Sequence, residues 1–237
     1  MGFRKYFNDF ITTLNKHKVR YVLLRGYENL PELYSNDLDF GIHPEDEDVF
    51  FDALNSYKNM YNLEVKMNLS RFRVLKLEFK YNDQTIDFDF WFNFNYCGLE
   101  YVSLTDTIIR SESYKNFIIP SASDELTISF LKELLHMGRL RKDKVNWLIK
   151  KIDKSNLEYF AIFFSLETRE NFLNVIKLRK FNLGSLSKKT KVELLKFHLT
   201  KENFVVTLFQ ILTFFYLRFF SSKNQLVIKF RKVFSTQ

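Results

Sequence analysis

The 237 residues suit one large domain or two small ones, and a 46% hydrophobic share with 27% charged residues is typical of a globular protein. The single cysteine, Cys97, excludes an internal disulfide and a thiolate zinc cluster, which favours a reducing, cytoplasmic setting. With 28 Phe and 12 Tyr but only 6 Gly and 3 Pro, the chain is expected to be largely helical outside its strands.

The net charge of +8 belongs to the C-terminal part of the chain. Residues 188–237 contain ten Lys or Arg and two Glu, and ten minus two is +8, so residues 1–187 are formally neutral. A basic tail favours an anionic partner, either a membrane or nucleic acid, although a solvated Lys-rich face is the commoner outcome. The first ten residues contain Asp9 and no apolar core, so they do not have the pattern of a secretory signal.

The N-terminal third predicts two helices and two strands. Apolar residues at three- and four-residue spacing predict an amphipathic helix over 4–16. Short apolar runs predict strands over 19–24 and 37–42. Pro44, followed by acidic residues, predicts a helix that begins there and runs to about residue 57.

Three further strands are predicted downstream. Alternating patterns cover residues 63–67, 72–81 and 85–92, and Asn82-Asp83 is a turn signal between the last two. The last of these strands places Ile86, Phe88 and Phe90 on one face. Asp87 and Asp89 then lie on the other face.

Two separate strands therefore present paired acids. Asp37 and Asp39 share a strand face in the same way as Asp87 and Asp89. If both strands belong to one sheet with a buried apolar face, all four carboxylates emerge on its open face. Clustered carboxylates repel one another unless a cation lies between them, so the pattern favours a site for a hard divalent ion such as Mg²⁺. For either pair alone, a polar strand face in water is the alternative.

The chain resembles a known superfamily at these residues. Arg25-Gly26, a loop, Asp37-Leu38-Asp39 and a later strand acid resemble the nucleotidyltransferase fold of the DNA polymerase beta superfamily. More narrowly, residues 21–40 resemble nucleotidyltransferase-like proteins of bacterial surface-polysaccharide loci. The resemblance covers roughly residues 18–100. It implies an α+β fold, with a mixed sheet and flanking helices followed by an all-helical domain.

The resemblance also implies a site. Its catalytic and metal-binding residues would be Asp37, Asp39, Asp87 and Asp89, and its nucleotide-binding residues would be Arg25, Gly26, Tyr27 and Asn36. Whether Asp87 or Asp89 is the third metal ligand is open, with Asp89 preferred. Arg73 or Lys76 could neutralise phosphate charge, although both have exposed strand positions as the alternative. Tyr27 stands where the family has Gly or Ser, which predicts crowding near the phosphates unless the loop takes another path.

The activity that the resemblance implies is Mg²⁺-dependent transfer of a nucleotidyl group. The donor would be a nucleoside triphosphate such as ATP, and the acceptor a small molecule such as a sugar or sugar phosphate in surface-glycan synthesis. The alternatives are a catalytically degenerate nucleotide- or sugar-binding protein of the same fold and a membrane-peripheral accessory protein. No specific nucleic acid is expected, because the sheet domain lacks a basic stripe.

The C-terminal half predicts helices. Residues 120–124 suggest a boundary, with Ser123 as a helix cap, and divide the chain into 1–119 (nucleotidyltransferase-like), 120–187 (helical) and 188–237 (basic, Phe-rich and helical). Helical spacing of apolar residues continues from 126 to 178, and Leu183-Gly184-Ser185 suggests a helix end.

Residues 204–220 form a nearly continuous apolar run of 17 residues. That length is at the low limit for a bilayer span, and Gln210 and Arg218 argue against lipid on all sides. A buried helix, or one lying on a membrane surface with the basic residues of 221–237 toward anionic lipid, is favoured instead. His136 and His198 are expected to be ordinary helix residues, and the Phe stripes to be core.

Overall fold

The computed structural model describes residues 3–31, 38–61, 63–69, 74–81, 84–141, 147, 165–177 and 184–220. They divide into two compact units. The first comprises Met1–Phe94, Val102–Phe130 and Asn146–Phe160, and the second comprises Asn95–Tyr101, Leu131–Val145 and Ala161–Gln237. The domain boundaries predicted from the sequence, at 119/120 and 187/188, stay predictions.

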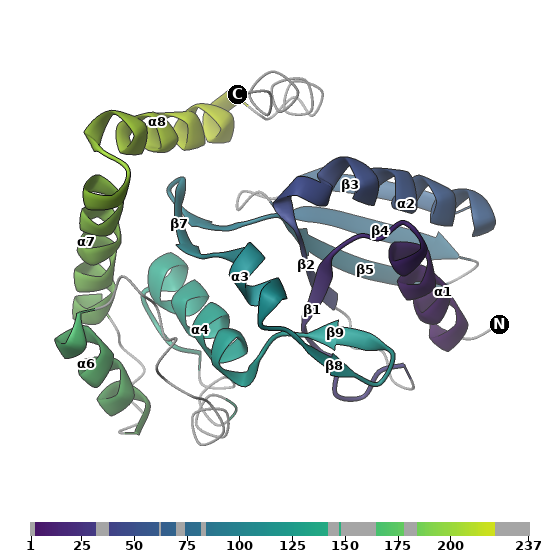
Figure 1. The fold of residues 1–237 in the computed structure, drawn as a ribbon, viewed down its shortest axis with the longest axis horizontal. Coiled ribbons are helices and arrows are strands. Elements are labelled where there is room, and N and C mark those ends of the chain that lie inside the picture. The colour runs from purple at the N-terminus through teal and green to yellow at the C-terminus, as the bar shows by residue number, and fades with distance from the viewer. Residues whose placement is uncertain are drawn as a thin grey trace. The chain divides into compact units, whose positions relative to one another are not determined.

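The first unit is built on a five-stranded mixed sheet with the order β1-β2-β5-β4-β3 (Figure 1). The strands are β1 (Tyr21–Arg25), β2 (Leu38–Ile42), β3 (Glu64–Leu69), β4 (Leu75–Tyr81) and β5 (Gln84–Trp91). Only the β2–β5 pair is parallel, and β1–β2, β4–β5 and β3–β4 are antiparallel. All five predicted strands are present, so the α+β class is confirmed. The predicted turn at Asn82-Asp83 lies outside the described residues.

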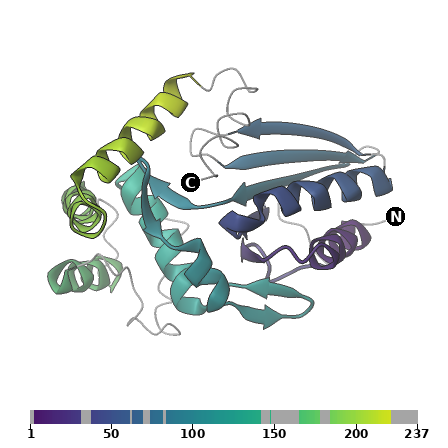
Figure 2. The same cartoon turned by 45° about the horizontal axis from the view of Figure 1, so that its top comes forward.

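Two predicted helices pack on one face of this sheet, as Figures 1 and 2 show. They are α1 (Phe3–Lys16) and α2 (Glu47–Tyr61), the second preceded by a 3-10 turn at Pro44–Asp46. The apolar stripe of α1 predicted from sequence is the stripe that is buried, with Phe7, Phe10 and Leu14 at 1% exposure or less. The apolar side of the helices and the apolar face of the strands, both predicted from sequence, therefore pack against each other in one core.

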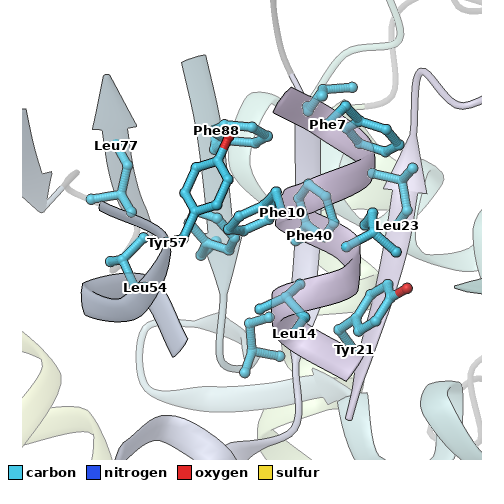
Figure 3. Close-up of a cluster of buried hydrophobic side chains, with 14 of the residues drawn as sticks. Phe7, Phe10, Leu14, Tyr21, Leu23, Phe40, Leu54, Tyr57, Leu77 and Phe88 are labelled. Carbon is cyan, nitrogen blue, oxygen red and sulfur yellow. The ribbon is translucent and has the colours of Figure 1, made fainter. Parts of the chain in front are cut away.

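Phe10 lies at the centre of that core (Figure 3). Its ring is 5.0 Å from the ring of Phe88 and 5.1 Å from that of Tyr57, measured between centroids. The rings of Phe40, Phe79 and Phe90 also lie within 6.4 Å of it. Because Phe40 and Phe88 alternate with Asp39 and Asp89 along β2 and β5, burial of the rings turns the two acids to the opposite face.

An ion pair ties the start of β1 to the turn that follows β2. Arg20 donates to Asp46 from its backbone N at 2.8 Å, from Nε at 2.9 Å and from a terminal nitrogen at 2.6 Å. The same guanidinium lies 3.1 Å from Glu45, whose side chain is 78% exposed, whereas that of Asp46 is only 12% exposed. The hydrogen bonds from Arg20 hold the pKa of Asp46 below its usual value of 3.8.

Asp46→Asn is therefore expected to lower stability in a pH-dependent way. Because the folded pKa is depressed, the stabilisation is present above the unfolded value of 3.8 and disappears as pH falls through the folded value. Arg20 is half exposed, so we expect a loss of only about 1 kcal/mol at pH 7. Chemical denaturation between pH 2 and 7 measures it. Glu45→Gln is the matched control, and an equal loss in that variant would contradict the assignment.

The remainder of the first unit contains one hairpin that the sequence patterns did not predict. A hairpin of β8 (Glu112–Tyr114) and β9 (Phe117–Ile119) lies beside β1, after α3 (Leu104–Ile109). Its turn places Lys115 at a φ of 54°, which sequence spacing does not reveal. In α4 (Ala122–Lys132) the predicted cap is wrong. Ser121, not Ser123, accepts the bond from the Asp124 N–H at 3.2 Å, and Ser123 is buried.

The second unit contains the hairpin of β6 (Phe94–Tyr96) and β7 (Leu99–Val102) together with helical segments. The helical segments are a π-helical turn at Glu133–Met137, α6 (Leu166–Lys177), α7 (Gly184–Lys201) and α8 (Phe204–Phe220). The predicted helix end at Leu183–Ser185 is wrong, because Gly184 begins α7. Of the two histidines, His136 stacks edgewise on Tyr96, and His198 Nε2 lies 2.9 Å from the carbonyl of Glu100. No helix in the described ranges has the length and apolar character needed to cross a membrane.

Candidate functional site on the open face of the sheet

The site begins where β1 ends. Arg25 closes the strand and stands opposite Asp39 of β2, after a register shift between Leu23 and Arg25. Gly26 then takes a φ of 77°, a left-handed conformation that suits glycine. The predicted Arg25-Gly26 element therefore marks a turn of the chain beside the first acidic residue.

Asp39 is buried at 2% exposure and is held from two sides. Arg25 Nε donates to its Oδ2 in an ion pair, and Trp91 Nε1 donates to its Oδ1 at 3.0 Å. Trp91 comes from the end of β5, so two neighbouring strands orient one carboxylate. Alternation along β5 puts Trp91 on the same face as Asp87 and Asp89, but it does not reveal the bond to Asp39.

Asp89 lies beside Asp39, in register across the parallel β2–β5 pair. It is 8% exposed, and Lys76 of β4 donates to its Oδ2 at 2.9 Å. The prediction that acids from two distant segments share one face is confirmed for these two residues. Of the two candidates for the third ligand, Asp89 is the one in register with Asp39.

Asp87 lies two residues before Asp89, on the same face of β5. It is exposed and pairs in register with Glu78 of β4. Like charges directly opposite one another are unfavourable in a sheet, and salt or a bound cation relieves the repulsion. The open face of β2, β5 and β4 therefore carries Asp39, Asp89, Asp87 and Glu78, together with the cations Arg25, Lys76 and Lys80, the last lying 3.6 Å from Glu78.

Three predicted residues, Asn36, Asp37 and Arg73, lie outside the described residues. Among the residues that the structure does describe, no group of three or more His, Cys, Asp or Glu side chains is arranged to hold a metal ion. The charge of Asp39 and Asp89 is offset by Arg25 and Lys76. The electrostatic need for a metal, inferred from sequence, therefore does not follow from these two carboxylates alone.

The donor set nevertheless fits a hard divalent cation. Asp39 and Asp89 offer adjacent carboxylates, the ligand type that Mg²⁺ takes in proteins. Their protein counter-ions are not deeply buried, since the side chain of Lys76 is 48% exposed and that of Arg25 is 33% exposed. Both cations are therefore accessible to solvent and to a ligand from the open face.

Gly41 lets another element approach the site. A Cβ at this position would lie 2.5 Å from Leu104 Cδ1 and 3.0 Å from Val22 Cγ1. Leu104 begins α3, so the lack of a side chain at Gly41 allows this helix to pack onto the acid-bearing face of β2. An isolated glycine within a strand is the sequence signal for such close approach.

Tyr27 does not project over the acids. Its side chain is 4% exposed, its ring packs edgewise on Tyr114, and its hydroxyl donates to Glu125 Oε2 at 2.7 Å. Burial, together with the nearby Glu125 carboxylate, raises the pKa of the Tyr27 hydroxyl well above its usual range. The loop after Gly26 thus takes the alternative path, which turns the tyrosine ring into the protein.

Tyr27→Phe is expected to destabilise the first unit by about 1.5–3 kcal/mol, because a buried carboxylate loses a hydrogen bond. Denaturant unfolding measures the loss. Tyr114→Phe is the matched control, since its hydroxyl makes only an exposed contact of 3.4 Å. Equal stability of the two variants would mean that the bond to Glu125 contributes nothing.

Comparisons with known proteins add no identification. No family model matches the chain, and searches of curated proteins and of solved structures found no match either. The class that the structure defines is an α+β protein with a mixed sheet, whose open face carries adjacent acids and nearby cations.

Proposed function

We propose that this protein is a Mg²⁺-dependent nucleotidyltransferase that moves a nucleotidyl group from a nucleoside triphosphate to a small hydroxyl-bearing acceptor. The observation that supports the proposal is the in-register pair Asp39 and Asp89, with Arg25 and Lys76 beside it. In this reaction the acceptor oxygen forms a bond to the α-phosphorus, and the bond to pyrophosphate breaks. A sugar or sugar phosphate of surface-glycan synthesis is the acceptor class that the sequence resemblance suggests.

Asp39 and Asp89 would hold the metal, with Asp37 and Asp87 as further carboxylates. Magnesium bound there would neutralise phosphate charge and make an acceptor hydroxyl more acidic. Trp91 keeps Asp39 oriented through its second oxygen, the role that hydrogen-bonded neighbours have around metal-binding carboxylates.

Arg25 and Lys76 have two successive roles in this proposal. Without substrate they neutralise the two carboxylates. When a triphosphate enters with its cation, they turn to the phosphate oxygens, where an arginine can form two parallel hydrogen bonds. Gly26, which carries no side chain, leaves the backbone at the end of β1 open to close approach by phosphate.

A second candidate function is binding without turnover. It is favoured by the same ion pairs, because both described carboxylates have protein cations beside them. The open face would then bind a phosphate-bearing nucleotide or sugar through Arg25 and Lys76. Such binding needs no divalent ion, which distinguishes it from the first candidate.

Two measurements on the full chain test the proposal. Thermal shift with the four common ribonucleoside triphosphates, with and without Mg²⁺, detects binding as a rise in Tm. Pyrophosphate release in the presence of a panel of sugars and sugar phosphates detects turnover. We expect both signals to require Mg²⁺. Stabilisation that is equal with EDTA, without pyrophosphate release, would favour the second candidate.

A further inference from the structure

Helix α8 turns its polar residues toward the protein. Thr207 is 1% exposed, and Gln210 donates to Glu202 Oε2 at 2.7 Å. A Cβ on Gly98, in the β6–β7 turn, would lie 2.5 Å from the carbonyl oxygen of Gln210, so backbone meets backbone on this side of the helix. A surface helix normally buries its apolar stripe, whereas the buried side of α8 carries Thr207 and Gln210 beside the buried Phe214 and most of its apolar residues are exposed.

The outward side of α8 is apolar. Val205 is 73% exposed, and Phe209 and Leu212 are each 57% exposed. The exposed apolar residues of the helix are Phe204, Val205, Val206, Leu208, Phe209, Leu212, Phe215 and Tyr216. At 100° per residue, all of these except Val206 fall on one arc of the helix. Contiguous exposed apolar surface of this kind marks a site that binds another protein or a membrane.

Helix α7, in the same unit, also exposes apolar side chains. Val192, Leu195 and Leu199 are exposed at three- and four-residue spacing, on one side of the helix. Lys188 and Lys196 are exposed around that stripe. We define the amphipathic surface as the exposed apolar residues of α8.

We propose that the amphipathic surface binds the headgroup region of an anionic lipid bilayer, with α8 lying in the plane of the membrane. The described helices are too short or too polar to span a bilayer, but an interfacial helix has no such length requirement. The proposal concerns a surface in the second unit and is independent of the activity proposed for the sheet of the first.

The positive charge of the C-terminal residues favours an anionic lipid surface, rather than a second copy of the chain, as the partner of the amphipathic surface. The sequence of α8 contains Arg218 and no acid, and residues 221–237 add Lys223, Lys229, Arg231 and Lys232, again with no acid. An anionic bilayer attracts this charge, at roughly 1 kcal/mol for each basic residue near the surface. Self-association through the same surface would instead bring two equally basic segments together.

Flotation of the full chain with vesicles tests the proposal. We expect binding to phosphatidylcholine vesicles that contain 30% phosphatidylglycerol, and at least tenfold weaker binding to pure phosphatidylcholine or at 0.5 M salt (roughly the loss of a few screened basic contacts). Val205→Asp with Leu212→Asp should abolish flotation. The matched control is Met60→Asp with Ile109→Asp, which adds the same charge at two exposed apolar residues of the first unit. This control should float as wild type does.

A fluorescent reporter tests the location of contact without removing apolar surface. In Val205→Trp, brominated lipids should quench the added emission, and in Met60→Trp they should not. The proposal is overturned if neutral and anionic vesicles bind equally, if the Val205/Leu212 variant still floats, or if tryptophan at 205 is unquenched in bound protein. Concentration-dependent dimerisation that the same double variant removes, without flotation, would assign the surface to a second copy.

Discussion

Asp39→Asn is expected to reduce Mg²⁺-dependent pyrophosphate release by about 10³-fold or more, since a metal ligand that stabilises several kcal/mol of developing charge is lost. The substitution keeps the shape of the side chain and one oxygen for the bond from Trp91. It removes the charge that pairs with Arg25, whose side chain is 33% exposed and can turn to solvent. Initial rates at saturating triphosphate measure the effect.

The control for this experiment is Asp52→Asn, which changes an exposed acid of α2 in the helical layer of the first unit. Its rate should equal that of the wild type. Lys76→Gln provides a second signature: it should lower the Mg²⁺ concentration needed for half-maximal binding, because Asp89 loses a competing cation, and should weaken triphosphate binding. Unchanged rates in Asp39→Asn would remove the metal-binding role from Asp39.

Phe10→Ala is expected to produce the largest loss of stability, about 3–5 kcal/mol, because the ring is fully buried and its removal leaves a cavity. That loss is a large fraction of the stability of an ordinary domain. Five aromatic rings surround the position, so the site cannot collapse onto a small side chain without moving β2 and β5. Urea denaturation gives the free energy of unfolding.

Phe3→Ala is the comparison for Phe10→Ala. Phe3 lies on the same helix and stacks on Phe7, but it is only partly buried. We expect a loss of about 1 kcal/mol there, in proportion to the smaller apolar area removed from water. A loss as large as that of Phe10→Ala would contradict the assignment, because Ala is the better helix former and only lost packing can destabilise either variant.

The apolar patterns of this sequence determined its elements and its faces. Strict alternation in β5 and the spacing of Phe7, Phe10 and Leu14 in α1 each allow one buried side, so the strands, the flanking helices and the placing of Asp39 and Asp89 on one open face could be predicted. The apolar run of α8 likewise coincides with the observed helix. These properties depend on near neighbours in the chain, which periodicity reports directly.

Tertiary structure alone decided what the acidic residues touch. The ion pairs of Asp39 with Arg25 and of Asp89 with Lys76, and the bond from Trp91, depend on strand order and register across the sheet. The same holds for Tyr27, whose partner Glu125 lies far along the chain, and for α8, whose apolar side faces outward. Burial of a residue follows from its own pattern, whereas the identity of its partner is set by which distant strand or helix the fold brings beside it.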